Sequence, residues 1–359
     1  LGEINETYIT EPIFSTMNYS EYILGHLPLI ISVPHGGRLF PPEIPDRKRN
    51  HPSVVKSNDL NTQDIGRELA DKIMMHFKGI RPYLIINHLG RSKIDVNRLI
   101  EEGVEGEDSI TFMAWNDYHN FIQTAIKDVE VNFDHGLLID IYGHSHPENF
   151  IELGYVISTE TLSLSTSHIN ENAEIYSGSS IRALYTRKSS SIKFANLLYG
   201  KTTSLGGRLQ SHGYDTVPSH IHQHPIKDEK YFHGGYCVQK YGSRHAEHII
   251  DAIQIELPRT LRAGNKERRS NKALEILKEL ADSEDVTVKY KAKFNIAKHL
   301  LDPGKGNELD REKNRKLALE LLKDAADNGI ENARIQYEKE LKNEKQNEKK
   351  TSQKYCLIT

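Results

Sequence analysis

Three places in the chain carry residues with the chemistry of metal ligands, each beside an apolar or helical stretch. They are His35 in Pro-His-Gly-Gly, Asp59 at the start of a helical pattern, and the pair His144 and His146 after an apolar run. Two histidines and a carboxylate with an open fourth position are typical of catalytic zinc. The structural alternatives are a turn histidine bonded to backbone at position 35 and an acid stabilised by a helix dipole at position 59.

A second group offers fixed charge and a candidate base. Arg91, Asn97 and Arg98 combine guanidinium groups, which bind carboxylates through two parallel hydrogen bonds, with an amide; surface ion pairing is the alternative. Glu256 lies in the alternating stretch Ile-Gln-Ile-Glu-Leu, on the same strand face as Gln254. A carboxylate in so apolar a stretch needs a partner or a purpose. It is either a general base that activates a metal-bound water or half of a buried salt bridge.

The elements that position these residues are short apolar runs, rich in β-branched residues, that alternate with helical patterns. Helices are expected at Asp59–Phe77 and Trp115–Val131, and the Ser-, Thr- and Gly-rich stretch 159–235 is expected to hold short helices and long loops. Alternating strands and helices predict an α/β sheet with helices on both faces. Ligands bind at the carboxyl ends of such strands, where the polar clusters would converge. The expected strands are Leu27–Val33, Pro82–Asn87, Gly136–Tyr142, Glu152–Ser158 and Ile250–Leu257.

Composition divides the 359 residues into two parts. All but one of the 18 histidines lie before residue 265, and the exception is His299. The net charge of −3 gives no bias toward nucleic acid, and two cysteines exclude a disulfide scaffold and a four-cysteine zinc module. The sequence contains no apolar run long enough for a membrane helix. The histidines of the Pro-flanked polar loop, namely His220, His222 and His224, are expected to be exposed rather than metal-bound.

The region 265–342 reads as a small all-α repeat. Ala273–Asp282 and Ala318–Asp327 are identical at seven of ten positions, and a second helical stretch follows each, at Ala292–Leu301 and Ala333–Leu341. This spacing is typical of helical solenoid repeats and resembles SEL-one-like repeats, which suggests a protein partner; a plain helical cap is the alternative. The tail 343–359 is expected to be disordered. Its final Cys-Leu-Ile-Thr fits the prenylation pattern imperfectly. We therefore expect membrane association only if Cys356 is prenylated.

The motifs of residues 1–264 resemble those of the N-formylglutamate amidohydrolase family, a relative of zinc carboxypeptidases and aspartoacylase-type deacylases. They run in family order across most of residues 27–262. The resemblance implies an α/β fold of the phosphorylase/hydrolase-like type, one zinc ion, and hydrolysis of an N-acyl amino acid. The matching stretches are SVPHGG (32–37), SNDLNTQDI (57–65), Arg91 with DVNR (95–98), DYHNF (117–121), LLIDIYGHSH (137–146), GGY (234–236) and DAIQIELPR (251–259).

The resemblance also implies residue roles. His35 and Asp59 correspond to metal ligands, Glu256 to the general base, Arg91 to the group that stabilises the oxyanion, and Asn97 with Arg98 to the clamp on the substrate carboxylate. The family's third ligand is a histidine two residues after the strand aspartate, and Tyr142 occupies that position here. We expect His144 to replace it, because Gly143 lets the chain turn toward the cleft, with His146 as the alternative.

The resulting hypothesis is a cytoplasmic, zinc-dependent hydrolase of a small N-acyl, N-formylglutamate-like amino acid. The alternatives are a metallocarboxypeptidase, another N-acyl amino acid deacylase, and a catalytically inactive binding or scaffold protein. Tyr142 favours the inactive alternative.

Overall fold

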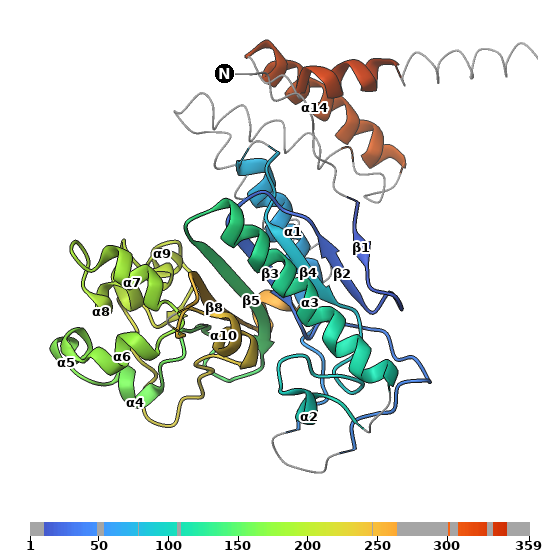
Figure 1. The fold of residues 1–359 in the computed structure, drawn as a ribbon. Helices are drawn as coiled ribbons and strands as arrows, with labels where there is room; N and C mark the ends of the chain where they lie inside the picture. The colour runs from blue at the N-terminus through green and yellow to red at the C-terminus, as the bar shows by residue number, and fades with distance from the viewer. Residues whose placement is uncertain are drawn as a thin grey trace, which may run out of the picture. The chain divides into compact units, whose positions relative to one another are not determined.

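The computed structural model describes residues 11–48, 54–77, 79–105, 109–245, 247–263, 301, 308–328 and 333–342. The chain divides into two compact units, Leu1–Ala263 and Gly264–Thr359. The first unit is an eight-stranded sheet with helices packed against it (Figure 1).

The sheet is parallel at its centre and antiparallel toward its edges. Its strand order is β1-β2-β4-β3-β5-β8-β6-β7, in which β4, β3, β5 and β8 run parallel to their neighbours in that group. The carboxyl ends of these four strands therefore meet at one edge of the sheet. The strands are β1 (Ile13–Phe14), β2 (Ser20–Ile23), β3 (Leu29–Val33), β4 (Tyr83–Asn87), β5 (Gly136–His144), β6 (Ile151–Gly154), β7 (Thr216–Val217) and β8 (Ile250–Pro258).

Helices cover both faces of the sheet, because side chains alternate along each strand. On one face, Ile31 and Val33 of β3 belong to the same core as Ala70 of α1 (Thr62–His76). On the other face, Ile30 belongs to a larger core with Tyr118 of α3 (Ser109–Asn132). The predicted α/β class with helices on both faces is confirmed.

The stretch after β6 forms a lobe of short helices, as its composition predicts. These helices pack their apolar side chains, including Phe194 and Leu198, against Leu153 of β6 and Ile253 of β8. The lobe contains α4 (Thr159–Leu162), α5 (Thr166–Glu171), α6 (Ala173–Gly178), α7 (Arg182–Lys188), α8 (Phe194–Tyr199) and α9 (Leu205–Ser211). Elsewhere in the first unit lie α2 (Ile100–Gly103), α10 (Tyr236–Tyr241) and α11 (Arg259–Arg262).

The sequence-based boundaries differ from the structure at the sheet edges. Strands β1 and β2 were not predicted, because they are two and four residues long and precede the strong apolar runs. The predicted strand Glu152–Ser158 is shorter in the structure, since β6 ends at Gly154. It pairs antiparallel with β8.

In the second unit, α14 (Glu308–Asp327) and helical residues 333–342 share a small apolar core. Its buried members are Ala318, Leu322, Ala325 and Ala333. The predicted first repeat copy at 273–282, the start of its partner helix at 292–300, and the tail with Cys356 lie outside the described residues. The repeat assignment stays a prediction.

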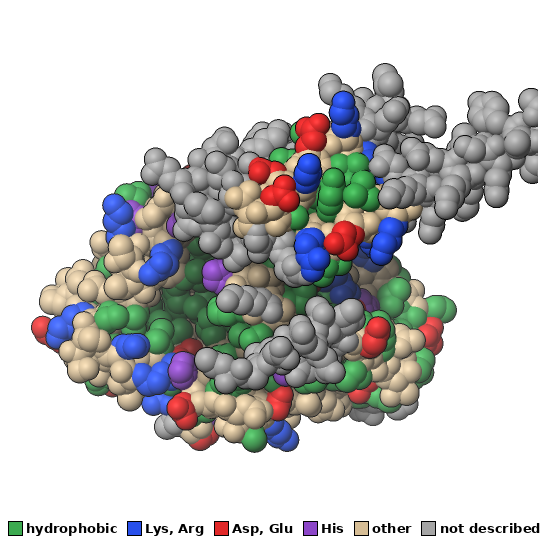
Figure 2. All heavy atoms as spheres, turned by 90° about the horizontal axis from the view of Figure 1, so that it is seen from above, with side chains coloured by type: hydrophobic (Ala, Val, Ile, Leu, Met, Phe, Trp, Pro, Cys, Tyr) green, Lys and Arg blue, Asp and Glu red, His purple; other side chains and the backbone are tan. Residues whose placement is uncertain are grey.

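Charged side chains of both signs are interspersed over the described part of the face drawn in Figure 2. Such mixing creates no extended potential of one sign across that face. Within the described residues, the helices are all too short or too polar to cross a bilayer.

Candidate active site

A cavity of about 470 Å³ opens where the carboxyl ends of β3, β5 and β8 meet. This volume suits a small-molecule ligand. All seven residues singled out from the sequence line it: His35, Asp59, Arg91, Asn97, Arg98, His144 and Glu256. The polar clusters at the strand ends therefore meet in one cleft, as expected. This position does not by itself assign a chemical role to any of them.

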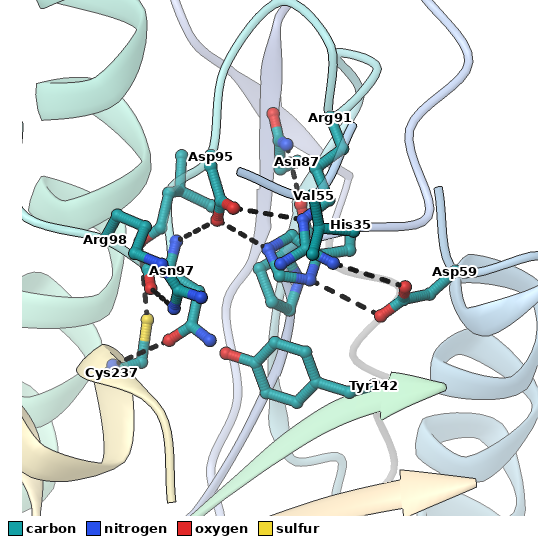
Figure 3. Close-up of polar contacts among 12 residues, drawn as sticks. His35, Val55, Asp59, Asn87, Arg91, Asp95, Asn97, Arg98, Tyr142 and Cys237 are labelled. Atoms are coloured by element: carbon teal, nitrogen blue, oxygen red, sulfur yellow. Dashed lines mark hydrogen bonds and ion pairs between the residues drawn. The ribbon is translucent and has the colours of Figure 1, made fainter. Parts of the chain in front are cut away.

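His35 is buried just past β3, and both of its ring nitrogens face carboxylates. Nε2 lies 2.7 Å from Asp95 Oδ1, and Nδ1 lies 3.4 Å from Asp59 Oδ2 (Figure 3). Nδ1 has no hydrogen-bond partner among the described residues. The chain after His35 can pass close to the backbone of Leu89 because Gly37 has no side chain: a Cβ at that position would lie 2.1 Å from the carbonyl oxygen of Leu89.

Fixed positive charge surrounds these carboxylates. Arg91 Nε donates to Asp95 Oδ2 at 3.0 Å, Arg91 Nη1 lies 3.8 Å from Asp59 Oδ1, and Arg47 Nη1 lies 3.6 Å from Asp95 Oδ2. Burial alone would raise the pKa of Asp95, but His35, Arg91 and Arg47 outweigh it and hold that pKa well below its usual value. Asp95 is thus an ionised anchor that orients both His35 and Arg91.

Glu256 is buried on β8 and presents one oxygen without a partner. Oε1 accepts a hydrogen bond of 2.8 Å from Gln254 Nε2, whereas Oε2 has no partner among the described residues. Burial raises the pKa of Glu256 well above its usual value, and the charges of Asp59 and Glu152 raise it further against the opposing effect of Arg91. A carboxyl group of this kind in a cleft has the basicity expected of a general acid–base residue.

Asn97 and Arg98 stand on another side of the cavity. Asn97 Oδ1 accepts from the Cys237 backbone N–H at 3.1 Å, so its amide Nδ2 is the end free to donate. A Cβ on residue 235 would lie 2.3 Å from that Nδ2 and would clash with it. Gly235 therefore leaves the Asn97 amide accessible. Arg98 donates to its neighbour's carbonyl at 2.9 Å, and no carboxylate of the described residues pairs with it. The pair can receive a ligand carboxylate.

Tyr142 does not supply the third ligand of a zinc site beside His35 and Asp59. Its ring is edge-on to His35, with centroids 5.0 Å apart, and its hydroxyl donates to Asp140. In Figure 3 the hydroxyl lies on the Asn97 side of the ring, away from Asp59. Burial, and then the charge of Asp140, raise the pKa of Tyr142 well above its usual value. The phenol therefore stays protonated and is a poor metal ligand.

His144 also points elsewhere. Its Nε2 lies 2.8 Å from the Phe150 carbonyl oxygen and 3.6 Å from Glu152 Oε1, and its Nδ1 accepts from the His146 backbone N–H at 3.0 Å. His35 and Asp59 fit two positions of a metal centre, because His35 has the buried free nitrogen and the outer carboxylate that metal-bound histidines usually have. Catalytic zinc takes three protein ligands. His35, Asp59 and His144 line one cavity, but the ring nitrogens of His144 face the Phe150 carbonyl oxygen and the His146 N–H. As a ligand set for one zinc ion, the three therefore do not fit.

The group of ligand atoms that does converge is different. Within the described part of the chain, His144, His146 and Glu152 form a possible metal-binding triad, with one ligand atom from each lying within 4.8 Å of the others. Sequence reasoning considered both histidines but missed Glu152. The available signal was the one used for Glu256: a carboxylate inside the apolar stretch Ile-Glu-Leu. The two glutamates face each other across the β6–β8 pairing.

Comparison with known proteins adds a distant likeness. A scan against protein-family models and a search of the curated proteins gave no match. Among solved structures, the chain is similar to the crystal structure of N-formylglutamate amidohydrolase from Ralstonia eutropha JMP134. The identity is 13% and the TM-score is 0.38, over 84% of this chain and 94% of the other. A likeness this weak carries no argument about function, which has to come from the site.

Proposed function

We propose that the cavity hydrolyses the amide bond of a small N-acyl amino acid, of which N-formylglutamate is the first to test. The observation that supports it is the arrangement of Glu256, Arg91 and the Asn97–Arg98 pair around one cavity of about 470 Å³. Such a substrate has three features to match: an acyl carbon open to attack, a carbonyl oxygen that gains negative charge, and a free carboxylate. The cavity has one group for each.

Glu256 would remove the proton from the attacking water. Its Oε2 is unpartnered among the described residues, Gln254 holds the other oxygen, and Glu256 is one of the residues that line the cavity. As the carbon–nitrogen bond breaks, the same carboxyl group would return the proton to the leaving amine. The raised pKa supports these transfers, because a carboxylate whose pKa is raised is a stronger base than an ordinary one.

Arg91 would stabilise the charge that develops on the carbonyl oxygen. Asp95 and Asp59 orient its guanidinium group, which keeps further N–H donors, since the group has five. Arg98 and the Asn97 amide would hold the substrate carboxylate. Asp95 also fixes this part of the chain, by accepting from the Asn97 backbone N–H at 3.0 Å. No step here passes through zinc, because the predicted ligands do not fit it.

A second candidate is a protein that binds acidic ligands without turning them over. The position of Tyr142 supports it, since that phenol stands where the resembling family has a metal ligand. The carboxylate clamp would remain useful in such a protein.

The deciding experiment measures binding and turnover side by side. The full chain is incubated with a panel of N-acyl amino acids that varies the acyl group and the amino acid, and free amine is quantified. Binding of the same compounds is measured by calorimetry. Turnover of an N-acyl amino acid that is lost in Glu256→Gln supports the hydrolase. Binding that depends on Arg98, with no turnover of any member, supports the binding protein instead.

A further inference from the structure

We propose that His144, His146 and Glu152 bind one divalent transition-metal ion, of which zinc is the best-matched member. This site is distinct from the His35–Asp59 pair, and it stands independently of the proposed hydrolase function. Two imidazoles and one carboxylate are a donor set that zinc uses with an open fourth position.

One ligand atom from each of the three side chains already lies within 4.8 Å of the other two. Glu152 Oε1 lies 2.6 Å from His146 Nδ1 and 3.6 Å from His144 Nε2. The two imidazole rings lie 4.7 Å apart between centroids. Zinc bonds of about 2.0–2.2 Å place neighbouring ligand atoms roughly 3.5 Å apart, so small rotations would admit an ion.

The surroundings hold each ligand in place. Glu152 Oε2 accepts a 2.8 Å hydrogen bond from the Phe232 backbone N–H, which leaves Oε1 as the oxygen that faces the histidines. The His146 ring stacks on Phe232, with centroids 4.8 Å apart and planes at 29°. The side chains of His144 and Glu152 are 1% and 2% exposed, and that of His146 is 12% exposed. Bound ligands oriented by such outer contacts are characteristic of metal centres.

Because Glu152 is buried, a metal ion would stabilise its charge better than the present hydrogen bonds do. A buried carboxylate needs compensation, and a cation shared by all three groups compensates it more fully than one short contact to His146. Coordination through His144 Nε2 would replace its contact with the Phe150 carbonyl oxygen, and the protons now on the ligand nitrogens would leave. Metal binding should therefore release protons and rearrange the 145–150 segment.

The site lies beside the proposed catalytic carboxyl group without including it. Glu152 and Glu256 are direct partners in the β6–β8 pairing, and His144 and His146 line the same cavity as Glu256. An ion here would be reachable from the cavity through the more exposed His146.

The test is a metal titration of the full chain after treatment with a chelator. Cobalt(II) alone is added and followed by its visible absorption, and zinc alone is followed by calorimetry with its proton release. We expect about one ion per chain. His146→Ala and Glu152→Gln should weaken binding by more than the roughly 10–100-fold that loss of an outer contact costs. Each variant's fold is checked by circular dichroism and thermal unfolding without metal.

Two matched controls separate this site from its neighbours. His222→Ala removes a histidine whose ring lies 4.8 Å from that of Phe150, close to the triad but outside it. His35→Ala removes the imidazole that lies between Asp59 and Asp95, outside the triad. Both should bind as the unmodified chain does. The proposal is overturned if the unmodified chain binds neither ion at millimolar concentration, or if His35→Ala abolishes binding while Glu152→Gln retains it. Neither result depends on hydrolysis, so the proposed function is judged separately.

Discussion

The replacement of Glu256 by Gln separates its chemical role from its structural one. Gln has nearly the same shape, and its carbonyl oxygen can keep the hydrogen bond that Glu256 Oε1 accepts from Gln254. The new amide group would take the place of Oε2, a buried atom that has no partner among the described residues. The variant therefore loses the negative charge and the ability to accept a proton, and little else.

We expect kcat to fall by about 10²–10⁴-fold, with KM nearly unchanged, because general-base catalysis contributes about that much. The corresponding increase in the activation barrier is about 2.7–5.4 kcal/mol.

Although Glu256→Gln should lower kcat, it should not lower the stability of the folded protein at high pH. The pKa of Glu256 is raised in the folded protein by burial and by two neighbouring carboxylates, so the folded state binds the proton more tightly than the unfolded chain does. The unfolding free energy then falls as pH rises through the unfolded pKa toward the folded one. Each whole pH unit between these two values costs about 1.4 kcal/mol. Glu256→Gln should thus unfold at the same or higher urea concentration than the unmodified chain at pH 8, with little difference at pH 4.

The assays are steady-state hydrolysis of the best N-acyl amino acid and urea unfolding at both pH values. Activity within tenfold of the unmodified chain would refute the general-base assignment. A variant that is much less stable at pH 8 would refute the account of the pKa, because it would mean that the charged carboxylate makes stabilising contacts.

Three further predictions concern substrate binding, pH and the second unit. Arg98→Ala should raise KM by about tenfold to a hundredfold, as expected for a lost charge-assisted contact, and substrates without a carboxylate should not respond. Burial raises the pKa of Asp140 to about 6, against the hydrogen bonds from Ser32 and Tyr142, so its contribution to unfolding free energy should fall by roughly 2 kcal/mol between pH 4 and 7. Asp140→Asn should remove this decline in urea unfolding measured across that pH range; an unchanged slope would contradict it. A chain ending at Ala263 should keep its activity per folded molecule, since every described residue that lines the cavity belongs to the first unit; a folded but inactive truncation would give the second unit a role at the site.

Local sequence is enough to predict the central strands of the sheet and the candidate residues that line the cavity. Alternation along β8 places Gln254 and Glu256 on one face, and the apolar runs of β3 and β5 end where the polar clusters begin. The carboxyl ends of parallel strands share one edge, so His35 and Glu256 were bound to approach the same cavity once a parallel sheet formed. Short edge strands such as β1 carry too few apolar residues for this kind of inference.

Side-chain direction beyond the strand ends was decided only by tertiary structure. The sequence predicted that His144 would turn toward the cleft, but no local pattern specifies which groups the last side chain of a strand such as β5 will meet. The antiparallel addition of β6 beside β8 brings Glu152 next to His144, and the segment that contains Phe232 then holds the other carboxylate oxygen of Glu152. The hydrogen bond between Phe232 and Glu152 alone joins residues 80 positions apart. Because such contacts depend on which strands become neighbours, the chain reveals them only when folded.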